Sequence, residues 1–496
     1  MIALLAAITV CLLIALGIWA ALRPYDALIL LLALLVFHSG AVHVLDNLMH
    51  INGTLLALLS AWKEAVIAGL FVAALFRFRR RPVRLQFPAI VAICFLFLVA
   101  FRVALDIVAH VPMSDELLGA RDASEFAIVF LAVTVLQPDV AWLRRASWVL
   151  VPLVLLAAEA GIVQLLFPPL LYKALYQAAG VPLASAFSAR FGGAVVLRAV
   201  GTYTAPNEFG LGLTVYLMAV MLPLALFRFR GQSRAILGAA ATMSGIALVL
   251  TYSRSAWVGL AVAVAVVAFL LRRRIFGWID VRRGHGPTST RTIAIGVAAV
   301  LVFVAIGGVF VASGGMRFLV TTLTGQEASA AGRPSSLAKG LGAFLSHPLG
   351  EGVTAAGPKA RAINRSAVLT ENWFLVYGIQ LGWLALGALF TFAGACFVLL
   401  ARRVDAALSS IDAIAEKAAF QVGAAGALAG ALAGALFIPA LLDLPASLTL
   451  WTFVAVALVP AAAEAGVIPT ETVTAEASNP SAPEARERPD RKGARR

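Results

Sequence analysis

Long apolar runs separated by short polar segments make up most of this chain, from its first residues to about residue 462. Each run holds roughly 17 to 25 residues, the length that an α-helix needs to cross about 30 Å of hydrocarbon. The pattern therefore predicts about 12 to 13 membrane-spanning helices. The runs lie at 2–22, 27–45, 55–76, 85–105, 123–137, 146–167, 207–227, 235–252, 256–271, 292–312, 372–400, 419–438 and 445–462.

Composition supports this prediction and excludes a soluble protein. Of the 496 residues, 61% are hydrophobic and 13% are charged, too few charges to cover a globular surface. The run at 2–22 has no basic leader and no small-residue cleavage site, so we expect a retained helix. An all-α integral membrane protein is predicted. The cysteines lie inside apolar runs and predict neither a disulfide framework nor a metal cluster; they are Cys11, Cys94 and Cys396.

The net charge of +14 is spread in short basic clusters between the runs, which indicates membrane topology and no nucleic-acid partner. The clusters fall in alternate loops, so the positive-inside rule places them all in the cytoplasm. Segments 168–206, 252–255 and 313–371 then face outward, which in the inner membrane of a bacterium means the periplasm. The cytoplasmic clusters are 77–84, 143–147, 227–234, 271–284 and 401–406.

This pattern divides the chain into four parts. We expect an N-terminal transmembrane bundle at 1–312 and a large periplasmic loop with short helices at 313–371. C-terminal transmembrane helices at 372–462 and a disordered cytoplasmic tail at 463–496 follow. The tail is rich in Pro, Ala, Glu and Arg and almost free of large apolar residues.

Two arginines on the outward side, Arg198 and Arg254, lie within a few residues of a predicted span. The positive-inside rule does not account for positive charge on that side. Charge held at the edge of the hydrocarbon is costly, so we interpret both as binding residues. Loop 168–206 is expected to form a short interfacial helix and then an irregular segment. Asn207 is expected to cap the next span, whose N-terminus would favour an anion beside Arg198.

The loop at 313–371 is expected to cover the outer ends of the spans. Ser335 or Ser336 can begin a helix that ends at 346–352 and carries an apolar stripe. The loop closes with Glu371 and Asn372 at the entrance to a long span, where the helix dipole favours a carboxylate. The stripe consists of Leu337, Leu341, Phe344 and Leu345.

Three outward motifs occur in order: R-x-x-G-T-Y-x-x-P-N at 198–207, T-x-S-R-S-A at 251–256, and H-P-L-G-x-G at 347–352 followed by Glu371-Asn372. Together with W-K-E at 62–64, they resemble the O-antigen ligase and polymerase superfamily over about residues 50 to 460. The resemblance implies a metal-independent membrane glycosyltransferase without a cofactor. Its partners would be an undecaprenyl diphosphate-linked oligosaccharide, a glycan or lipid acceptor, and the lipid bilayer.

The resemblance also implies roles for particular residues. Arg198 and Arg254 match the arginines that hold the lipid diphosphate, and Arg333 matches the arginine before the loop helix. Ligases of the family usually carry His before Asn at the end of the loop, as the general base; here that position is Glu371. This departure favours a polysaccharide polymerase, with O-antigen ligase as the alternative.

The chemistry agrees with these roles. Negative charge gathers on a diphosphate leaving group, and guanidinium groups can neutralise it without a metal. Glu371 would remove the proton of the acceptor hydroxyl. Asn207, Ser253 and Asn372 are expected to support the site with hydrogen bonds.

Two other classes of protein remain open. A transporter or flippase for a lipid-linked glycan would also need outward arginines, and the intramembrane Lys63 and Glu64 favour it, although adjacent residues do not face each other on a helix. A metal enzyme would use His43, Asp46 and His50, which have helical spacing near one end of a span.

Overall fold

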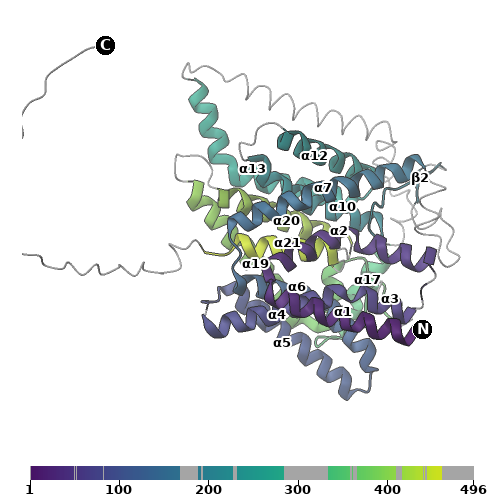
Figure 1. Ribbon diagram of the computed structural model, residues 1–496. Coiled ribbons are helices and arrows are strands. Elements are labelled where there is room, and N and C mark those ends of the chain that lie inside the picture. The colour runs from purple at the N-terminus through teal and green to yellow at the C-terminus, as the bar shows by residue number, and fades with distance from the viewer. Residues whose placement is uncertain are drawn as a thin grey trace, which may run out of the picture. The chain divides into compact units, whose positions relative to one another are not determined.

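The computed structural model is built almost entirely from helices (Figure 1). It describes residues 2–49, 51, 53–81, 83–167, 188–191, 194–226, 232–283, 333–357, 360, 366–408, 416–438, 441 and 444–460. Its helices are α1 (Ile2–Leu22), α2 (Pro24–Met49), α3 (Gly53–Ser60), α4 (Trp62–Arg80), α5 (Phe87–Val108), α6 (Met113–Leu136), α7 (Val140–Leu166), α10 (Pro206–Val215), the π-helix η2 (Tyr216–Met221), α11 (Leu222–Leu226), α12 (Gln232–Leu250), α13 (Arg254–Arg283), α17 (Arg333–Ser346), α19 (Trp373–Leu408), α20 (Glu416–Ala435) and α21 (Leu444–Ala457).

The predicted all-α membrane fold is confirmed. Among the described residues, ten helical segments are long and apolar enough to cross a membrane. Two further predicted spans, 123–137 and 445–462, are helices that differ from these ten: α6 carries several charges, and α21 has only 14 residues. The predicted run at 292–312 lies outside the described residues.

The loop at 168–206 contains an element that the sequence analysis did not predict. It is the antiparallel hairpin of β1 (Ser188–Phe191) and β2 (Ala194–Leu197), and residues 198–205 after it are irregular, as expected. Arg198 directly follows β2, so the paired strand fixes the backbone on its N-terminal side. The interfacial helix expected earlier in the loop, and the tail from 463, lie outside the described residues.

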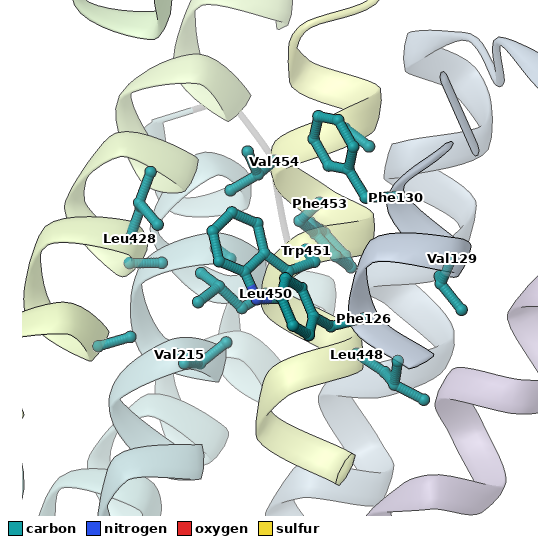
Figure 2. Close-up of a cluster of buried hydrophobic side chains, with 14 of the residues drawn as sticks. Phe126, Val129, Phe130, Val215, Leu428, Leu448, Leu450, Trp451, Phe453 and Val454 are labelled. Atoms are coloured by element: carbon teal, nitrogen blue, oxygen red, sulfur yellow. The ribbon is translucent and has the colours of Figure 1, made fainter. Parts of the chain in front are cut away.

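An aromatic cluster between α6, α19 and α21 forms the centre of the bundle. Trp451 of α21 is fully buried, and its ring centroid lies 4.6 Å from that of Phe392 and 5.5 Å from that of Phe126. Figure 2 shows Trp451 among Phe126, Phe130 and aliphatic side chains. Such rings bury much apolar area and fix the spacing of the helices around them.

Close helix packing in the same unit depends on glycine. A Cβ atom on Gly259 of α13 would lie 2.7 Å from the carbonyl oxygen of Gly430 on α20, and one on Gly430 would lie 2.5 Å from that of Gly259. Small residues let membrane helices approach this closely, because lipid-embedded helices associate mainly through packing. Residues Met1–Val459 accordingly form one compact unit, separate from Pro460–Arg496.

Basic residues gather at one end of the helices, which we call the Arg77 end. Arg77 donates a hydrogen bond to the Tyr25 hydroxyl at 2.8 Å, and Arg144 pairs with Glu416 at 3.0 Å. Arg403 donates to the carbonyl oxygen of Leu458 at 2.6 Å. These contacts place three of the predicted cytoplasmic clusters, 77–84, 143–147 and 401–406, at the same end. The orientation of that end in the membrane stays a prediction.

The loop of residues 347–352, which carries the H-P-L-G-x-G motif, fits into a break in α19. Gly382 has φ 86° and ψ −179°, which interrupts the helix and frees backbone groups. Non-helical backbone at membrane depth must find partners inside the protein. The loop supplies them through hydrogen bonds from Glu351 N to Ile379 O at 2.7 Å, Gly352 N to Gln380 O at 3.2 Å and Trp383 N to Pro348 O at 2.9 Å.

Arg102 of α5 fixes the same loop from the other side. Its guanidinium pairs with Asp106 one turn further along α5 and donates to the carbonyl oxygen of Gly350 at 2.9 Å. The motif at 347–352 therefore connects α5 to the broken part of α19, rather than simply ending the loop helix as the sequence suggested.

Candidate functional site

Arg198 is held at the turn that joins α12 to α13. Its Nε donates a hydrogen bond to the carbonyl oxygen of Thr251 at 2.8 Å, and its NH2 group donates to Asn207 Oδ1 at 2.6 Å. The backbone of the next residue adds a further bond to the end of α12, because Ala199 N donates to Leu250 O at 2.9 Å. These acceptors are neutral, so the bonds orient the guanidinium without cancelling its charge. A fixed, partly buried cation of this kind suits a phosphate ligand.

The turn itself has an unusual backbone. Tyr252 has φ 48°, a left-handed conformation that is uncommon for a residue other than glycine. Its ring is buried against Val196 and Trp257. The packed ring stabilises the turn, and local strain of this type is often found at functional sites.

Arg254 begins α13 directly after this turn and is partly exposed. Ser253 acts as the helix cap, because its Oγ accepts a hydrogen bond from Ala256 N at 3.3 Å. Ser253 and Ser255 also bond to each other at 2.9 Å, and both are buried. Ser253 was expected to support the site; in the structure it caps the helix that begins at Arg254, and its hydroxyl is buried.

Asn207 does not cap α10, contrary to the sequence prediction. The helix begins at Pro206, with Ala205 as its cap residue and no side-chain cap bond. Proline at the first helical position needs no N–H partner, and the helix starts two residues earlier than a cap at Asn207 would give. Asn207 is thereby in the first turn, where its side chain reaches Arg198.

Gln164 near the end of α7 positions the segment between Arg198 and Asn207, and the sequence analysis missed it. Its side chain is 1% exposed; its Nε2 donates to Gly201 O at 2.7 Å, and its Oε1 accepts from Gly201 N at 2.9 Å. Gly201 has φ 60°, which favours glycine in this tight turn. Thr202 then bonds to α2, where its carbonyl oxygen accepts from Gly40 N at 2.8 Å. A lone glutamine in an apolar span was the available signal.

Glu371 is exposed immediately before α19. Asn372 caps this helix, since its Oδ1 accepts from Leu375 N at 3.0 Å. Its Nδ2 donates to Leu436 O at 2.9 Å, just beyond the end of α20. Near that end, Gly434 approaches α13, and a Cβ atom there would lie 3.1 Å from the carbonyl oxygen of Ser255. The end of α20 thus connects the segment of Glu371 to the segment of Arg254.

The loop helix exists, but its apolar stripe faces outward. α17 begins at Arg333, and Ser336 bonds to the carbonyl oxygen of Leu369 at 2.7 Å. Of the predicted stripe, only Phe344 packs on α19, where its ring lies 5.8 Å from that of Trp383. The other members are exposed by 45% to 56% of their surface: Leu337, Leu341 and Leu345. The side chain of Arg333 is outside the described part of the chain.

Lys63 and Glu64 belong to a larger charged cluster than the sequence suggested. The Lys63 ammonium reaches back to the Glu64 carboxylate despite their adjacency, and Arg121 of α6 contacts the same carboxylate at 3.1 Å. Asp122 and Glu125 complete this α4–α6 cluster. Three charges within the five residues 121–125, at the start of the predicted run 123–137, were the missed signal.

The alternative metal site gains no support from the described residues. His43 and Asp46 lie on α2, whereas His50 is outside the described residues. Among the residues that are described, no group of three His, Cys, Asp or Glu side chains is arranged to hold a metal ion.

Comparison with known protein families finds a match in the middle of the chain. Residues 238–390 match the Wzy_C family, described as O-Antigen ligase. The matched segment runs from α12 into α19 and includes Arg254, the loop at 347–352 and Glu371. No curated protein and no solved structure matches the chain. Residues 238–390 of this membrane protein are thus similar to the Wzy_C O-antigen ligase domain.

Proposed function

We propose that this membrane protein belongs to the O-antigen ligase family and transfers glycan from an undecaprenyl diphosphate carrier, at the periplasmic face of the bacterial inner membrane. Polymerisation of a polysaccharide is the favoured reaction, and ligation to a lipid or protein acceptor is the alternative. The observation that carries the proposal is the meeting of Arg198 with the turn before Arg254, beside the segment that ends in Glu371.

In this proposal, Arg198 and Arg254 bind the diphosphate and neutralise the charge that develops as the glycosidic bond breaks. The hydrogen bonds from Arg198 to Thr251 and Asn207 fix its direction before substrate binds, so little reorganisation is needed during reaction. Arg333 at the start of α17 would approach the same diphosphate.

Glu371 would act as the general base for the acceptor hydroxyl. It stands just before the N-terminal end of α19, and Asn372 fixes that end through its cap and its bond to Leu436. The acceptor oxygen then attacks the anomeric carbon, the bond to the diphosphate breaks, and the proton remains on Glu371.

Reconstitution tests the proposal. The purified protein is reconstituted into vesicles and incubated with a lipid diphosphate-linked oligosaccharide in the presence of EDTA. The products are then separated by size. A ladder of longer lipid-linked glycans indicates a polymerase, and one product that requires an added acceptor indicates a ligase. Movement of the carrier between leaflets without a new glycan bond would instead favour a transporter.

Arg254→Ala is the matching variant. We expect it to remain folded and to abolish transfer. Arg145→Ala serves as its control, because Arg145 lies at the Arg77 end, is 70% exposed and pairs only loosely with Asp26 at 3.5 Å. An unchanged product pattern in Arg254→Ala would refute the proposed role of this arginine.

A further inference from the structure

The α4–α6 cluster places five ionisable side chains inside the helix bundle. Besides the Lys63–Glu64 and Arg121–Glu64 pairs, Arg121 bonds to Asp122 at 2.8 Å. Lys63 and Glu125 have side chains that are 4% and 5% exposed. Ionisable residues within membrane helices are costly and rare, and they usually mark a functional site.

Several acceptors in this cluster have no hydrogen-bond donor among the described residues. Neither carboxylate oxygen of Glu125 accepts a hydrogen bond, and its nearest cation is Arg121 Nε at 3.7 Å. Glu64 Oε2 is buried and likewise accepts none. A buried polar atom without a hydrogen bond is expensive, so a fold that only needed a stable ion-pair network would be expected to satisfy these atoms.

Two buried donors on α19 complement these acceptors. The Tyr377 hydroxyl and the Trp373 indole N–H are fully buried and donate to no described acceptor. The two rings lie 4.9 Å apart, and the Tyr377 ring lies 6.4 Å from that of Phe126, the neighbour of Glu125.

The same region adjoins the candidate functional site. Trp373 and Tyr377 occupy the first two turns of α19, directly after Glu371. On the other side, Trp62 precedes Lys63 and donates from its indole to His38 Nδ1 at 3.2 Å. His38 is two residues from Gly40, which bonds to Thr202 in the segment after Arg198. The cluster therefore lies between the segment of Glu371 and the segment of Arg198.

The mixture of groups selects a class of ligand. Three carboxylates disfavour a phosphate, and Lys63 and Arg121 disfavour a metal cation. A sugar ring is uncharged, and its hydroxyls both donate to carboxylates and accept from phenol and indole groups. Polar groups that converge in this way are typical of sites that fix the orientation of a small ligand.

We infer that the α4–α6 cluster, with Trp373 and Tyr377 of α19, is a sugar-binding subsite that holds the hydroxyls of a glycan next to Glu371. This inference rests on the proposed function and adds to it the residues that recognise the glycan. Glu125 accepts hydrogen bonds from sugar hydroxyls, Tyr377 donates to a sugar oxygen, and Lys63 and Arg121 hold the carboxylates in position.

Binding measurements with two probes test the inference. One probe is undecaprenyl diphosphate without sugar, and the other is the lipid diphosphate-linked oligosaccharide. Glu125→Gln and Tyr377→Phe should each weaken binding of the sugar-bearing probe by roughly 10- to 100-fold, the usual effect of one lost hydrogen bond to a charged group, and somewhat less for the neutral phenol. Binding of the sugar-free probe should stay unchanged.

Matched controls come from other parts of the bundle. Glu416→Gln changes a carboxylate that pairs with Arg144 at the Arg77 end, and Tyr216→Phe removes a buried hydroxyl from η2. Neither should alter binding of either probe. A third arm uses the free oligosaccharide: if its binding also falls in the variants, the subsite holds acceptor glycan, and if only the lipid-linked probe is affected, it holds donor glycan.

Other outcomes overturn the inference. Equal weakening of both probes would mean that the variants disturb the whole site, and unchanged binding of both would mean that no sugar contacts these groups. Loss of folding in both variants would show that the cluster only stabilises the bundle. If the sugar-free lipid fails to bind even the wild-type protein, the proposed function fails instead, so the two failures are distinguishable.

Discussion

The Arg198 guanidinium donates a 2.6 Å hydrogen bond to the Asn207 side chain, which joins the first and last of the ten residues in the first outward motif. The bond links the end of the β-hairpin to the first turn of α10. Because a hydrogen bond to a charged group contributes about 1.5–3 kcal/mol, it stabilises one direction of the guanidinium.

Asn207→Ala should therefore lower the efficiency of glycan transfer by roughly 10- to 100-fold, while the protein stays folded. The remaining bond from Arg198 to Thr251 keeps the arginine near the site, so we expect a weaker effect than that of Arg254→Ala. Initial rates at several donor concentrations measure this. Wild-type rates in Asn207→Ala would show that the direction of Arg198 does not matter.

Neighbouring residues at the start of α19 should have separable roles. Glu371→Gln should reduce turnover by roughly 10²- to 10⁴-fold without weakening binding of carrier lipid, because it removes only the proposed base. Asn372→Ala should lower the free energy of unfolding by about 0.5–2 kcal/mol, because it removes the helix cap.

Turnover, lipid binding and thermal unfolding, measured on both variants, make the comparison. The proposed base would be refuted by normal turnover in Glu371→Gln. If Glu371→Gln lowered the stability as much as Asn372→Ala does, Glu371 would instead have a structural role.

Gln164→Leu should destabilise the protein and impair transfer together. The leucine would remove the two hydrogen bonds that Gln164 makes with the backbone of Gly201, and the loss of a hydrogen bond in a buried site costs about 1–3 kcal/mol. The turn that positions Arg198 and Asn207 would then loosen. Thermal unfolding in detergent and initial rates test this, and the same change at the exposed Gln232 of α12 is the control. An unchanged unfolding temperature in Gln164→Leu would contradict the stabilising role of the Gln164–Gly201 hydrogen bonds.

Gly382→Ala should prevent the break in α19 from forming properly. An added Cβ would lie 2.5 Å from the carbonyl oxygen of Pro348, and the backbone has φ 86°. Strain of this kind costs about 1–3 kcal/mol in addition to the clash. Gly387→Ala, with nothing within 4 Å of the added atom, is the control on the same helix and should be neutral or stabilising.

Proteolysis of the loop at 347–352 in the Gly382→Ala variant gives a second readout. The loop bonds to the broken helix through its backbone, so it should become more accessible when the break closes. Equal protection of both glycine variants would show that the loop does not depend on the break.

The sequence by itself determined the membrane-helix architecture, because crossing hydrocarbon requires about 20 apolar residues with every backbone group bonded inside the segment. The run predicted at 2–22 is α1, and that at 85–105 is α5 with small shifts at its ends. The motifs likewise indicated Arg198, Arg254 and Glu371 as candidate site residues, since charged residues next to apolar runs are visible without a structure.

Only the tertiary structure decided which of these residues lie close together and which other residues hold them in place. Gln164 lies 37 residues from Gly201 in sequence, and Asn372 lies 64 from Leu436. The local pattern favoured Asn207 as a cap, yet packing placed its side chain on Arg198. Contacts of this kind depend on helix crossings set by shape, such as Gly259 against Gly430, and on partners for buried polar groups. Local periodicity records neither, because it reports only which face of each helix is apolar.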